Sequence, residues 1–429
     1  MRILVIDDSP PKRAHVLKVL TEGFEAYPPT VQEADDYDSA MRALESYHFD
    51  LVILDLLLPG PTGESSIEIS RAIMRNVLQG TATLAPAHII GLTAFAEFAT
   101  DEMESFGDKL LSLEVYSDTD LGWADRMISK IRYLMKSKLA ATSFQANSYD
   151  YDIVILTARY ENEYLPISKF LMPNPSTKSH SLWKGDASFG FMSMPEGRSL
   201  RAAILCVGEM GMAPTAAVAS QAISLFRPRL ITMVGMCCGF AADSCASPRK
   251  IMDVIVAREV RCWEEGRYED MARNRPEFKN KAKARLVDDV IREKVAQGIE
   301  KEVDTLRPTL QRFSETEDYL KIVNAFPEGY VRTVPNVQYS TMVSGSSVVA
   351  DKSMVSEIIE RNPTALALDM ELFGLYCAVE KSIGKRPSVL GLKGVADFGE
   401  VEKSDEAQKG ASLGSAIVLQ NLLPVLDIW

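Results

Sequence analysis

Apolar runs of strand length alternate with helical patterns in the first third of the chain. The runs lie at Ile3–Ile6, Leu51–Leu54, His88–Leu92 and Leu111–Tyr116, and apolar residues with helical spacing lie at Pro11–Leu20, Asp36–Ser46, Ser65–Gln79 and Leu121–Lys136. Strands that alternate with helices are typical of a parallel α/β sheet. Residues 1–138 are therefore predicted to form one α/β domain.

A second alternation of the same kind fills the rest of the chain. Strands are predicted near Tyr151–Leu156, Ala202–Val207, Arg229–Gly235, Asp253–Ala257 and Ser388–Lys393, and helices near Pro214–Phe226, Ala367–Lys381 and Asp405–Val425. The charged stretch from Arg258 to Pro335 is predicted to be helical. Residues 139–149 are small and polar without a clear period, which predicts a linker. The second domain is thus expected to span residues 150–429.

Composition narrows the class of protein. Of the 429 residues, 46% are apolar and 25% are charged, as in soluble globular proteins, and the net charge of −12 argues against binding to nucleic acid. No apolar run approaches the length needed to span a membrane, and the six cysteines show no C-x-x-C spacing. The chain starts directly with a strand-like segment, so no signal peptide is predicted. A cytoplasmic protein with reduced thiols is expected.

Acidic residues follow two of the N-terminal strands. Asp7 and Asp8 come directly after the first strand, Asp55 ends another, and Thr93 follows a third. The carboxyl ends of parallel strands lie at one edge of the sheet, so these side chains are expected to gather there. Three carboxylates repel one another unless a cation lies between them, and Mg²⁺ prefers such oxygen ligands. The pattern predicts a magnesium site.

With Gly91-Leu-Thr-Ala94 following, this set resembles the receiver domain of two-component response regulators over residues 1–138. The resemblance implies a flavodoxin-like fold with Asp55 as the phosphoacceptor and Thr93 as the switch hydroxyl. It also implies that Asp7 and Asp8, together with Asp55, bind Mg²⁺. A cognate histidine kinase or phosphotransfer protein would be the partner.

One feature departs from the receiver pattern. Receivers carry a lysine at the end of the fifth strand that contacts the phosphoryl group, whereas the matching stretch here is Val115-Tyr-Ser-Asp118. The nearest lysine, Lys109, lies earlier in the chain. A degenerate receiver that serves only for dimerisation therefore stays open as an alternative.

Six segments of the second half each follow a predicted strand or begin a predicted helix. They are Thr157–Glu163, Val207–Gly211, Met233–Gly239, Val343–Asp351, Ala367–Glu371 and Lys393–Asp397. In this order they resemble the nucleoside phosphorylase family, in its methylthioadenosine/S-adenosylhomocysteine nucleosidase branch, across residues 151–429. The resemblance implies an α/β domain with a mixed central sheet, a homo-oligomer, and cleavage of the N-glycosidic bond of a purine nucleoside or nucleotide.

The chemistry of that cleavage suggests a role for each acidic residue. The leaving base becomes an anion, and Asp397 is expected to protonate it at N7 as a general acid. Glu163 is expected to hold the attacking water, with Glu161 as the alternative because the family spacing differs by one residue. Glu371 would bind the ribose hydroxyls, with Met370 against the sugar. Further substrate contacts are expected from Gly208, Gly211, Cys237, Val348 and Val349.

The nucleophile is inferred from two methionines. Phosphorylases of this family bind inorganic phosphate with an arginine and a serine around the glycine of the third strand. Met233 and Met236 occupy these positions here and do not bind anions. Hydrolysis by water, with no cofactor for the glycosidase chemistry, is therefore expected.

The identity of the substrate is a separate question. Cationic residues follow the fourth strand, among them Arg267 and Arg275, and arginine suits phosphate oxygens. A receiver joined to a phosphorylase-like domain resembles the effector of Detocs-type defensive two-component systems, which implies anti-phage cleavage of ATP to adenine and ribose 5-triphosphate. Two alternatives stay open: a receiver-controlled nucleosidase for methylthioadenosine or S-adenosylhomocysteine, and a non-catalytic nucleotide-sensing module.

Overall fold

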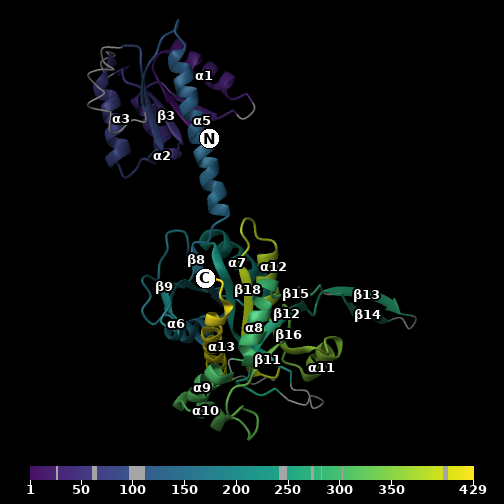
Figure 1. Ribbon diagram of the computed structural model, residues 1–429. Helices are drawn as coiled ribbons and strands as arrows, with labels where there is room; N and C mark the ends of the chain where they lie inside the picture. The colour runs from purple at the N-terminus through teal and green to yellow at the C-terminus, as the bar shows by residue number, and fades with distance from the viewer. Residues whose placement is uncertain are drawn as a thin grey trace. The chain divides into compact units, whose positions relative to one another are not determined.

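The computed structural model describes residues 1–25, 28–59, 65–95, 112–240, 249–271, 275–281, 283–301, 303–399 and 404–429. The chain divides into two compact units, Met1–Ser143 and Phe144–Trp429 (Figure 1). Within the described ranges, no helix is long and apolar enough to cross a bilayer.

The first unit is built on a parallel sheet. In the part of the chain that is described, its strands are β1 (Arg2–Ile6), β2 (Thr30–Ala34), β3 (Leu51–Asp55), β6 (His88–Thr93) and β7 (Ser112–Val115), in the order β2-β1-β3-β6-β7. Its helices are α1 (Pro10–Gly23), α2 (Tyr37–Ser46), α3 (Ile67–Gln79) and α5 (Gly122–Ala146), and a small ladder joins β4 (Leu58–Pro59) to β5 (Ser65–Ser66). This strand order is that of the flavodoxin-like doubly wound fold, which places ligands at the carboxyl ends of the strands.

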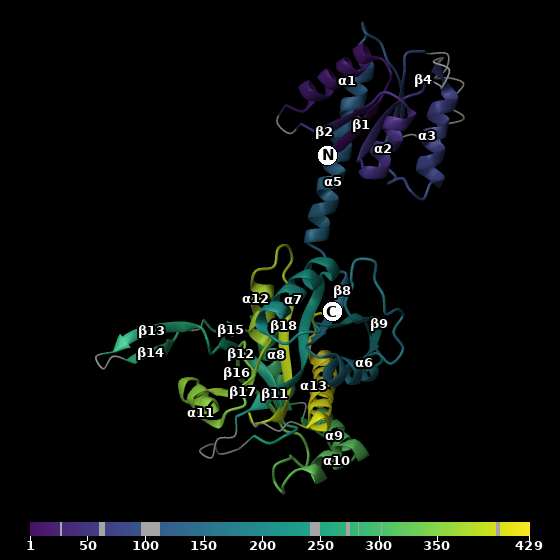
Figure 2. The ribbon, with the colours of Figure 1, turned by 180° about the vertical axis from the view of Figure 1, so that it is seen from behind.

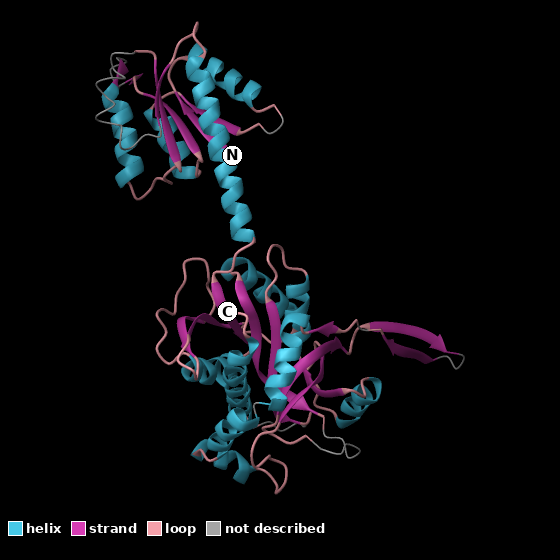
Figure 3. Ribbon diagram, in the orientation of Figure 1, coloured by secondary structure: helices cyan, strands magenta, loops and turns pink. Residues whose placement is uncertain are grey.

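Helices cover both faces of this sheet, as the cyan and magenta elements of Figure 3 show. Val16 and Leu20 of α1 and Met127 of α5 pack with one side of the strands. Leu44 of α2 and Ile73 of α3 pack with the other side. The central strands β1, β3 and β6 are apolar because both of their faces are buried, and the polar residues that follow them lie at the edge of the sheet.

The second unit is built on a mixed sheet. Its strands are β8 (Tyr151–Thr157), β9 (Ala187–Ser193), β10 (Ser199–Cys206), β11 (Pro228–Gly239), β12 (Val254–Cys262), β15 (Arg285–Leu286), β16 (Val337–Ser344), β17 (Ala365–Asp369) and β18 (Ser388–Asp397). They run in the order β15-β12-β16-β17-β11-β8-β10-β9, and β18 pairs with β11 and β12. A hairpin of β13 (Gly266–Met271) and β14 (Arg275–Asn280) extends from this body (Figure 2). The helices are α6 (Leu165–Leu171), α7 (Met212–Phe226), α8 (Asp289–Lys301), α9 (Val303–Ser314), α10 (Glu317–Ala325), α11 (Lys352–Arg361), α12 (Leu372–Glu380) and α13 (Asp405–Leu426), with a π-helical turn η1 at Tyr160–Tyr164.

Two glycines of β18 let helices approach the sheet closely from opposite faces. A Cβ at Gly391 would lie 2.6 Å from a side-chain carbon of Leu372 in α12. A Cβ at Gly394 would lie 2.1 Å from the carbonyl oxygen of Ala411 in α13. Residues three apart on a strand face opposite sides, so α12 and α13 enclose β18 between them. Strand β18 is thereby buried almost to its end at Asp397.

The expected fold class, a flavodoxin-like parallel sheet followed by an α/β domain with a mixed sheet, is confirmed. Three local predictions were wrong. Residues 139–146 continue α5 and are helical, because the alanines, Leu139 and Gln145 favour a helix more than their lack of period suggested. Ala367–Asp369 end a strand, and the helix that was predicted to start at Ala367 starts at Leu372.

The charged stretch from Arg258 to Pro335 was also predicted incorrectly in its first part. It contains the end of β12, the β13–β14 hairpin and β15 before the helices begin at Asp289. In the hairpin, Arg267 pairs with Lys279 and Glu269 with Glu277 across antiparallel strands. Backbone pairing decides the structure here, since the charged sequence of the hairpin has no apolar period to mark it.

Candidate functional site

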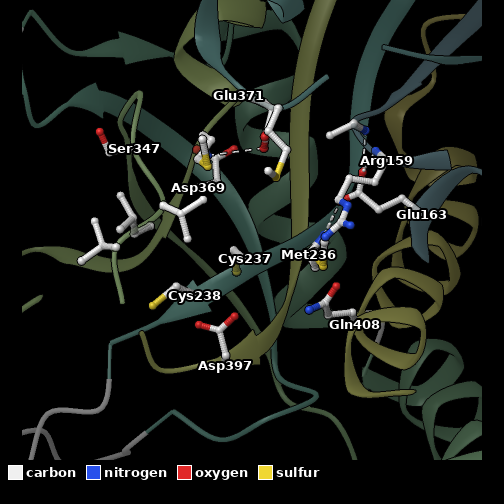
Figure 4. A pocket seen from close by; sticks show the side chains of 16 residues that line it. Arg159, Glu163, Met236, Cys237, Cys238, Ser347, Asp369, Glu371, Asp397 and Gln408 are labelled. Carbon is white, nitrogen blue, oxygen red and sulfur yellow. Dashed lines mark hydrogen bonds between the residues drawn. The ribbon is translucent and has the colours of Figure 1, made fainter. Parts of the chain in front are cut away.

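A pocket opens at the carboxyl ends of the strands of the second unit (Figure 4). Its volume is about 170 Å³. It is lined by Ala158, Arg159, Glu163, Met210, Met236, Cys237, Cys238, Ser347, Val348, Val349, Leu368, Asp369, Met370, Glu371, Asp397 and Gln408. The walls combine sulfur-containing and branched apolar side chains with four carboxylates, a mixture suited to a flat apolar ring joined to a polar group.

Glu163 lies in η1, the turn that follows β8, and it is buried. Its Oε2 accepts hydrogen bonds from the backbone N–H groups of Ala158 and Arg159, and its Oε1 accepts one from Met236 of β11 at 3.0 Å. Burial raises the pKa of Glu163, and the backbone donors and Lys393 oppose that rise. The carboxylate is therefore fixed in one orientation while remaining a stronger base than an exposed glutamate.

The position of Glu163 requires a glycine opposite it. A Cβ at Gly235 would lie 2.1 Å from Oε1 of Glu163. The N–H of Gly235 donates to Ser415 of α13 at 3.1 Å. The carboxylate of Glu163 thus packs against Gly235 of β11, while Ser415 of α13 binds the backbone of the same glycine.

Lys393 of β18 has no exposed surface and lies among three carboxylates. Its Nζ donates to Oε2 of Glu371 at 2.9 Å and lies 3.8 Å from Asp369 and 4.0 Å from Glu163. Burial alone would lower the pKa of Lys393, but the three carboxylates raise it above the ordinary value. The ammonium is therefore a permanent charge that compensates the acidic residues around it.

Asp369 closes this network at the end of β17. It accepts hydrogen bonds from the hydroxyl of Ser344 at 2.5 Å and from the N–H of Leu372 at 2.9 Å. Burial raises the pKa of Asp369 to about 6, and the charge of Glu371 adds to the rise while Lys393 opposes it. Asp369 thus connects β16, β17 and the start of α12.

Asp397 ends β18 and is half-buried. Its Oδ1 accepts a hydrogen bond from the N–H of Gly399 at 2.9 Å. In the β11–β18 ladder, Asp397 is the partner of Cys238, just after the register shift between Cys237 and Cys238. Figure 4 shows its carboxylate beside Cys238, apart from the group formed by Asp369 and Glu371. A substrate that fills the pocket would therefore meet carboxylates at separate places.

Most of the residues predicted to bind substrate line this pocket. They are Glu163, Cys237, Val348, Val349, Met370, Glu371 and Asp397. Of the two candidates for the water-binding glutamate, Glu163 is buried in the lining and Glu161 is exposed. Gly208 and Gly211 adopt φ angles of 83° and 123° in the loop that carries Met210 to the pocket, but they are not part of its lining.

The two arginines predicted to bind phosphate belong to the β13–β14 hairpin. Arg267 is in β13 and exposed, and Arg275 is in β14. Arg267 is not among the lining residues, so the structure does not bring it together with Glu163, Glu371 and Asp397. The side chain of Arg275 lies outside the described part of the structure.

Several residues of the pocket region were not assigned a role from the sequence, among them Arg159, Asp369, Lys393 and Gln408. Lys393 had a recognisable signal, since it is a lysine inside the apolar run Val389–Ala396. A charged residue in a buried strand needs a partner. Gln408 had no such signal in the sequence, because it lies in the separate helix α13. In the structure it lines the pocket, and its Oε1 accepts a hydrogen bond from the side chain of Asn162 at 2.8 Å.

The receiver unit brings its predicted residues to one edge of the sheet. Carboxylate oxygens of Asp7, Asp8 and Asp55 lie within 4.8 Å of one another. Oxygen donors of this type and spacing fit Mg²⁺. Thr93 is buried at the end of β6, and its hydroxyl accepts from the N–H of Phe95 at 3.2 Å.

A lysine that the sequence did not suggest lies inside this cluster. Nζ of Lys12, from α1, lies 2.9 Å from Asp7 and 2.8 Å from Asp55. It also donates to the carbonyl oxygen of Leu92 at 3.3 Å. Burial raises the pKa of Asp55 to about 6, while Lys12 opposes the rise and Asp7 adds to it.

The fifth strand of the receiver ends without a lysine, as the sequence indicated. β7 is followed by Tyr116, Ser117 and Asp118, and Lys109 lies outside the described residues. The hydroxyl of Tyr116 is 3.0 Å from Nδ1 of His15.

Comparison with known proteins identifies the first unit. Residues 3–100 match the response regulator receiver domain, so the chain has a receiver domain at its N-terminus. Over 69 residues the chain is 42% identical to the phosphate regulon transcriptional regulatory protein PhoB of Klebsiella pneumoniae, covering 16% of this chain and 28% of PhoB. Over 438 residues it is 25% identical to the uncharacterized protein y4jS of Sinorhizobium fredii, covering 97% of each chain.

Solved structures resemble part of the chain. A methylthioadenosine/S-adenosylhomocysteine nucleosidase from Colwellia psychrerythraea in complex with adenine superposes with a TM-score of 0.44 at 17% identity, covering 65% of this chain and 97% of its own. Futalosine hydrolase of Helicobacter pylori superposes with a TM-score of 0.44 at 12% identity, covering 64% of this chain and 98% of its own.

Replacing Lys393 with methionine is expected to destabilise the second unit, and more strongly at high pH. Breaking a buried charge network costs about 3–5 kcal/mol. A carboxyl whose pKa is higher in the folded protein favours folding at low pH and loses this contribution as the pH rises through the folded pKa. Without Lys393 the pKa values of Asp369 and Glu163 rise further, so the variant should lose additional stability between pH 5 and pH 8.

Urea unfolding of both proteins at pH 5 and pH 8 measures this difference. Lys381→Met, which removes an exposed lysine of the same unit, should unfold like the wild type at both values. If Lys393→Met lowers the free energy of unfolding by the same amount at pH 5 and at pH 8, the electrostatic role of Lys393 is contradicted.

Proposed function

We propose that the second unit is an N-glycosidase that hydrolyses a purine nucleotide, with ATP as the leading candidate. The observation that supports it is a single pocket in which Glu163, Glu371 and Asp397 are presented at separate places among apolar walls. Hydrolysis of an N-glycosidic bond needs a base for water, a group that binds the sugar and an acid for the leaving base.

In the proposed reaction the bond between C1′ and the base nitrogen breaks, and the electron pair leaves with the base. Asp397 gives its proton to N7 of the base, which leaves as the neutral purine. A water bound to Glu163 forms the new bond to C1′, and Glu163 takes its proton. The proton gained by Glu163 balances the one lost by Asp397, so solvent restores both groups. No cofactor is needed for these steps.

Glu371 and Lys393 prepare the sugar side of the pocket. Lys393 donates to Oε2 of Glu371 at 2.9 Å, which leaves Oε1 to accept ribose hydroxyls. Met370 supplies an apolar surface beside the sugar. Water is the proposed nucleophile because Met236, which lines the pocket, offers no donor to a phosphate ion. Met233, the other methionine at an expected phosphate position, is buried in the core and is not part of the lining.

A nucleotide substrate also needs a cation near the pocket. Among the described lining residues, Arg159 is the one with a cationic side chain, and it is exposed at the start of η1. Its guanidinium can bind phosphate oxygens in a bidentate manner. We propose Arg159 as a phosphate contact in addition to the predicted Arg267 and Arg275, which would need to act from outside the lining.

The receiver domain is proposed to control this activity through phosphorylation of Asp55 by a histidine kinase or phosphotransfer protein. Asp7, Asp8 and Asp55 would hold Mg²⁺, which when bound compensates the negative charge of the carboxylates and of the phosphoryl group. The protein would act as a homo-oligomer, without nucleic acid, as an anti-phage effector that depletes ATP. A nucleosidase for methylthioadenosine or S-adenosylhomocysteine and a nucleotide sensor are the competing functions.

Asp397→Asn is expected to lower the rate of adenine release by about 10²–10⁴-fold, because an amide cannot donate a proton as a general acid. The affinity for substrate, measured by calorimetry with the inactive variant, should change little. Glu360→Gln, at an exposed position of the same unit, should retain full activity. Equal turnover by Asp397→Asn and the wild type would rule out Asp397 as the acid.

Arg159→Ala is expected to lower kcat/KM for ATP by about 10- to 100-fold, the value of a charge-assisted hydrogen bond. The kcat/KM for methylthioadenosine, which has no phosphate, should stay within about threefold. Arg267→Ala is the matched comparison, and a selective loss for ATP in this variant instead would move the phosphate site to the hairpin. No selective loss in either variant would favour a nucleoside substrate.

Asp55→Asn is expected to abolish the increase in adenine release that a phosphodonor produces in the wild type. Asparagine has nearly the same shape but cannot form an acyl phosphate. The measurement compares adenine release with and without phosphoramidate and Mg²⁺, and Asp125→Asn, an exposed position in α5, serves as the control. An undiminished response in Asp55→Asn would contradict control by phosphorylation.

A further inference from the structure

The ammonium group of Lys12 reaches the ends of four neighbouring strands of the receiver sheet. It forms ion pairs with Asp7 after β1 and with Asp55 at the end of β3. It donates to the carbonyl oxygen of Leu92 in β6, and it lies 5.6 Å from the centroid of the Tyr116 ring after β7. The lysine thus occupies the centre of the edge at which the phosphoacceptor lies.

The place of Lys12 in α1 explains this reach. The helix begins at Pro10, directly beyond Asp7 and Asp8, so Lys12 is in its first turn. Side chains of a helix point toward its N-terminus, and this direction takes the ammonium of Lys12 back over the strand ends. Lys18, farther along the same helix, is exposed and pairs with Glu22 instead.

No other lysine contacts this edge within the described residues, and the stretch after β7 carries Tyr116, Ser117 and Asp118. A phosphoryl group on Asp55 adds about two negative charges, which need a cation beside them. The side chain of Lys12 is 7% exposed and 2.8 Å from an oxygen of Asp55, so it needs only a small rotation to meet that group.

We propose that Lys12 is the phosphoryl-contacting lysine of this receiver, supplied by α1 in place of the end of the fifth strand. This assignment rests on the proposed phosphorylation of Asp55. Before phosphorylation, the ammonium of Lys12 compensates Asp7 and Asp55. After it, the ammonium donates to the phosphoryl oxygens.

The transfer step increases the negative charge that Lys12 must meet, from one on the carboxylate to about two on the phosphoryl group. With phosphoramidate as donor, an oxygen of Asp55 forms a bond to phosphorus while the phosphorus–nitrogen bond breaks. The nitrogen leaves with its electron pair, takes up a proton from solvent and departs as ammonia. Asp55 gives up its own carboxylate charge, and the phosphoryl oxygens bring theirs to the same place, within reach of Lys12.

The test uses the full-length protein with Mg²⁺ and beryllofluoride, a stable mimic of the phosphoryl group. Lys12→Met is expected to bind beryllofluoride at least about 10-fold more weakly than the wild type, measured by ¹⁹F NMR, since it loses a charge-assisted hydrogen bond. Its affinity for Mg²⁺ alone, measured by calorimetry, should be equal or higher, because a competing cation has been removed. Lys18→Met should behave as the wild type in both measurements.

Several outcomes would overturn the proposal. One is a Lys12→Met variant that binds beryllofluoride as tightly as the wild type. Another is a Lys12→Met variant that loses affinity for Mg²⁺ alone to the same extent as for beryllofluoride, which would indicate that Lys12 only holds the carboxylates in place. A wild type that neither binds beryllofluoride nor accepts a phosphoryl group from phosphoramidate would instead refute phosphorylation of Asp55, and Lys12 with it.

A measurement on the wild type covers the case in which Lys12→Met does not fold. Acetylation of Lys12 by acetic anhydride, followed by mass spectrometry of peptides, should be slower with Mg²⁺ and beryllofluoride together than with Mg²⁺ alone. The acetylation rate of Lys18 should be the same in both conditions. Equal rates for Lys12 would overturn the proposal.

Discussion

The second unit depends on an ammonium group that has no contact with solvent. Burying Lys393 costs several kcal/mol unless carboxylates compensate it, and Glu163, Asp369 and Glu371 do so from two separate segments of the chain. The requirement therefore brings the turn after β8 and the end of β17 together beside β18. Gly235 and Gly394 are part of the same arrangement, because larger residues would displace Glu163 or separate β18 from α13. This packing fixes the positions of the carboxylates that line the pocket.

The receiver unit uses the same interaction at its own edge. Lys12 lies between Asp7 and Asp55, and all three side chains are largely buried. In both units a lysine keeps acidic residues close together in the folded protein when no ligand is bound. The difference is one of access: Lys393 is enclosed by helices on both faces of β18, whereas Lys12 lies at an open edge where a small ion and a phosphoryl group can reach it. Lys393 is therefore suited to hold its carboxylates permanently, whereas Lys12 is suited to exchange a carboxylate partner for a phosphoryl group.

Much of the fold could be predicted from the sequence, because the burial of strands imposes apolar runs. The placement of Asp7, Asp8 and Asp55 followed from the rule that parallel strands end at one edge. The β13–β14 hairpin could not be predicted, since its charged sequence carries no apolar period. Lys12 could not be assigned either, because a lysine in the first turn of a helix is usually exposed, and only the direction of α1 places it over the site. Lys393 could have been found as the charged residue of a buried strand.

The most direct test of the account is to incubate the purified protein with ATP, adenosine, methylthioadenosine and S-adenosylhomocysteine, and to follow free adenine by chromatography. Each substrate is tested with and without phosphoramidate and Mg²⁺. We predict adenine from ATP, released faster when the phosphodonor is present. Adenine from the thioether nucleosides alone would contradict the nucleotide substrate, and no adenine from any substrate under any condition would contradict the proposed N-glycosidase.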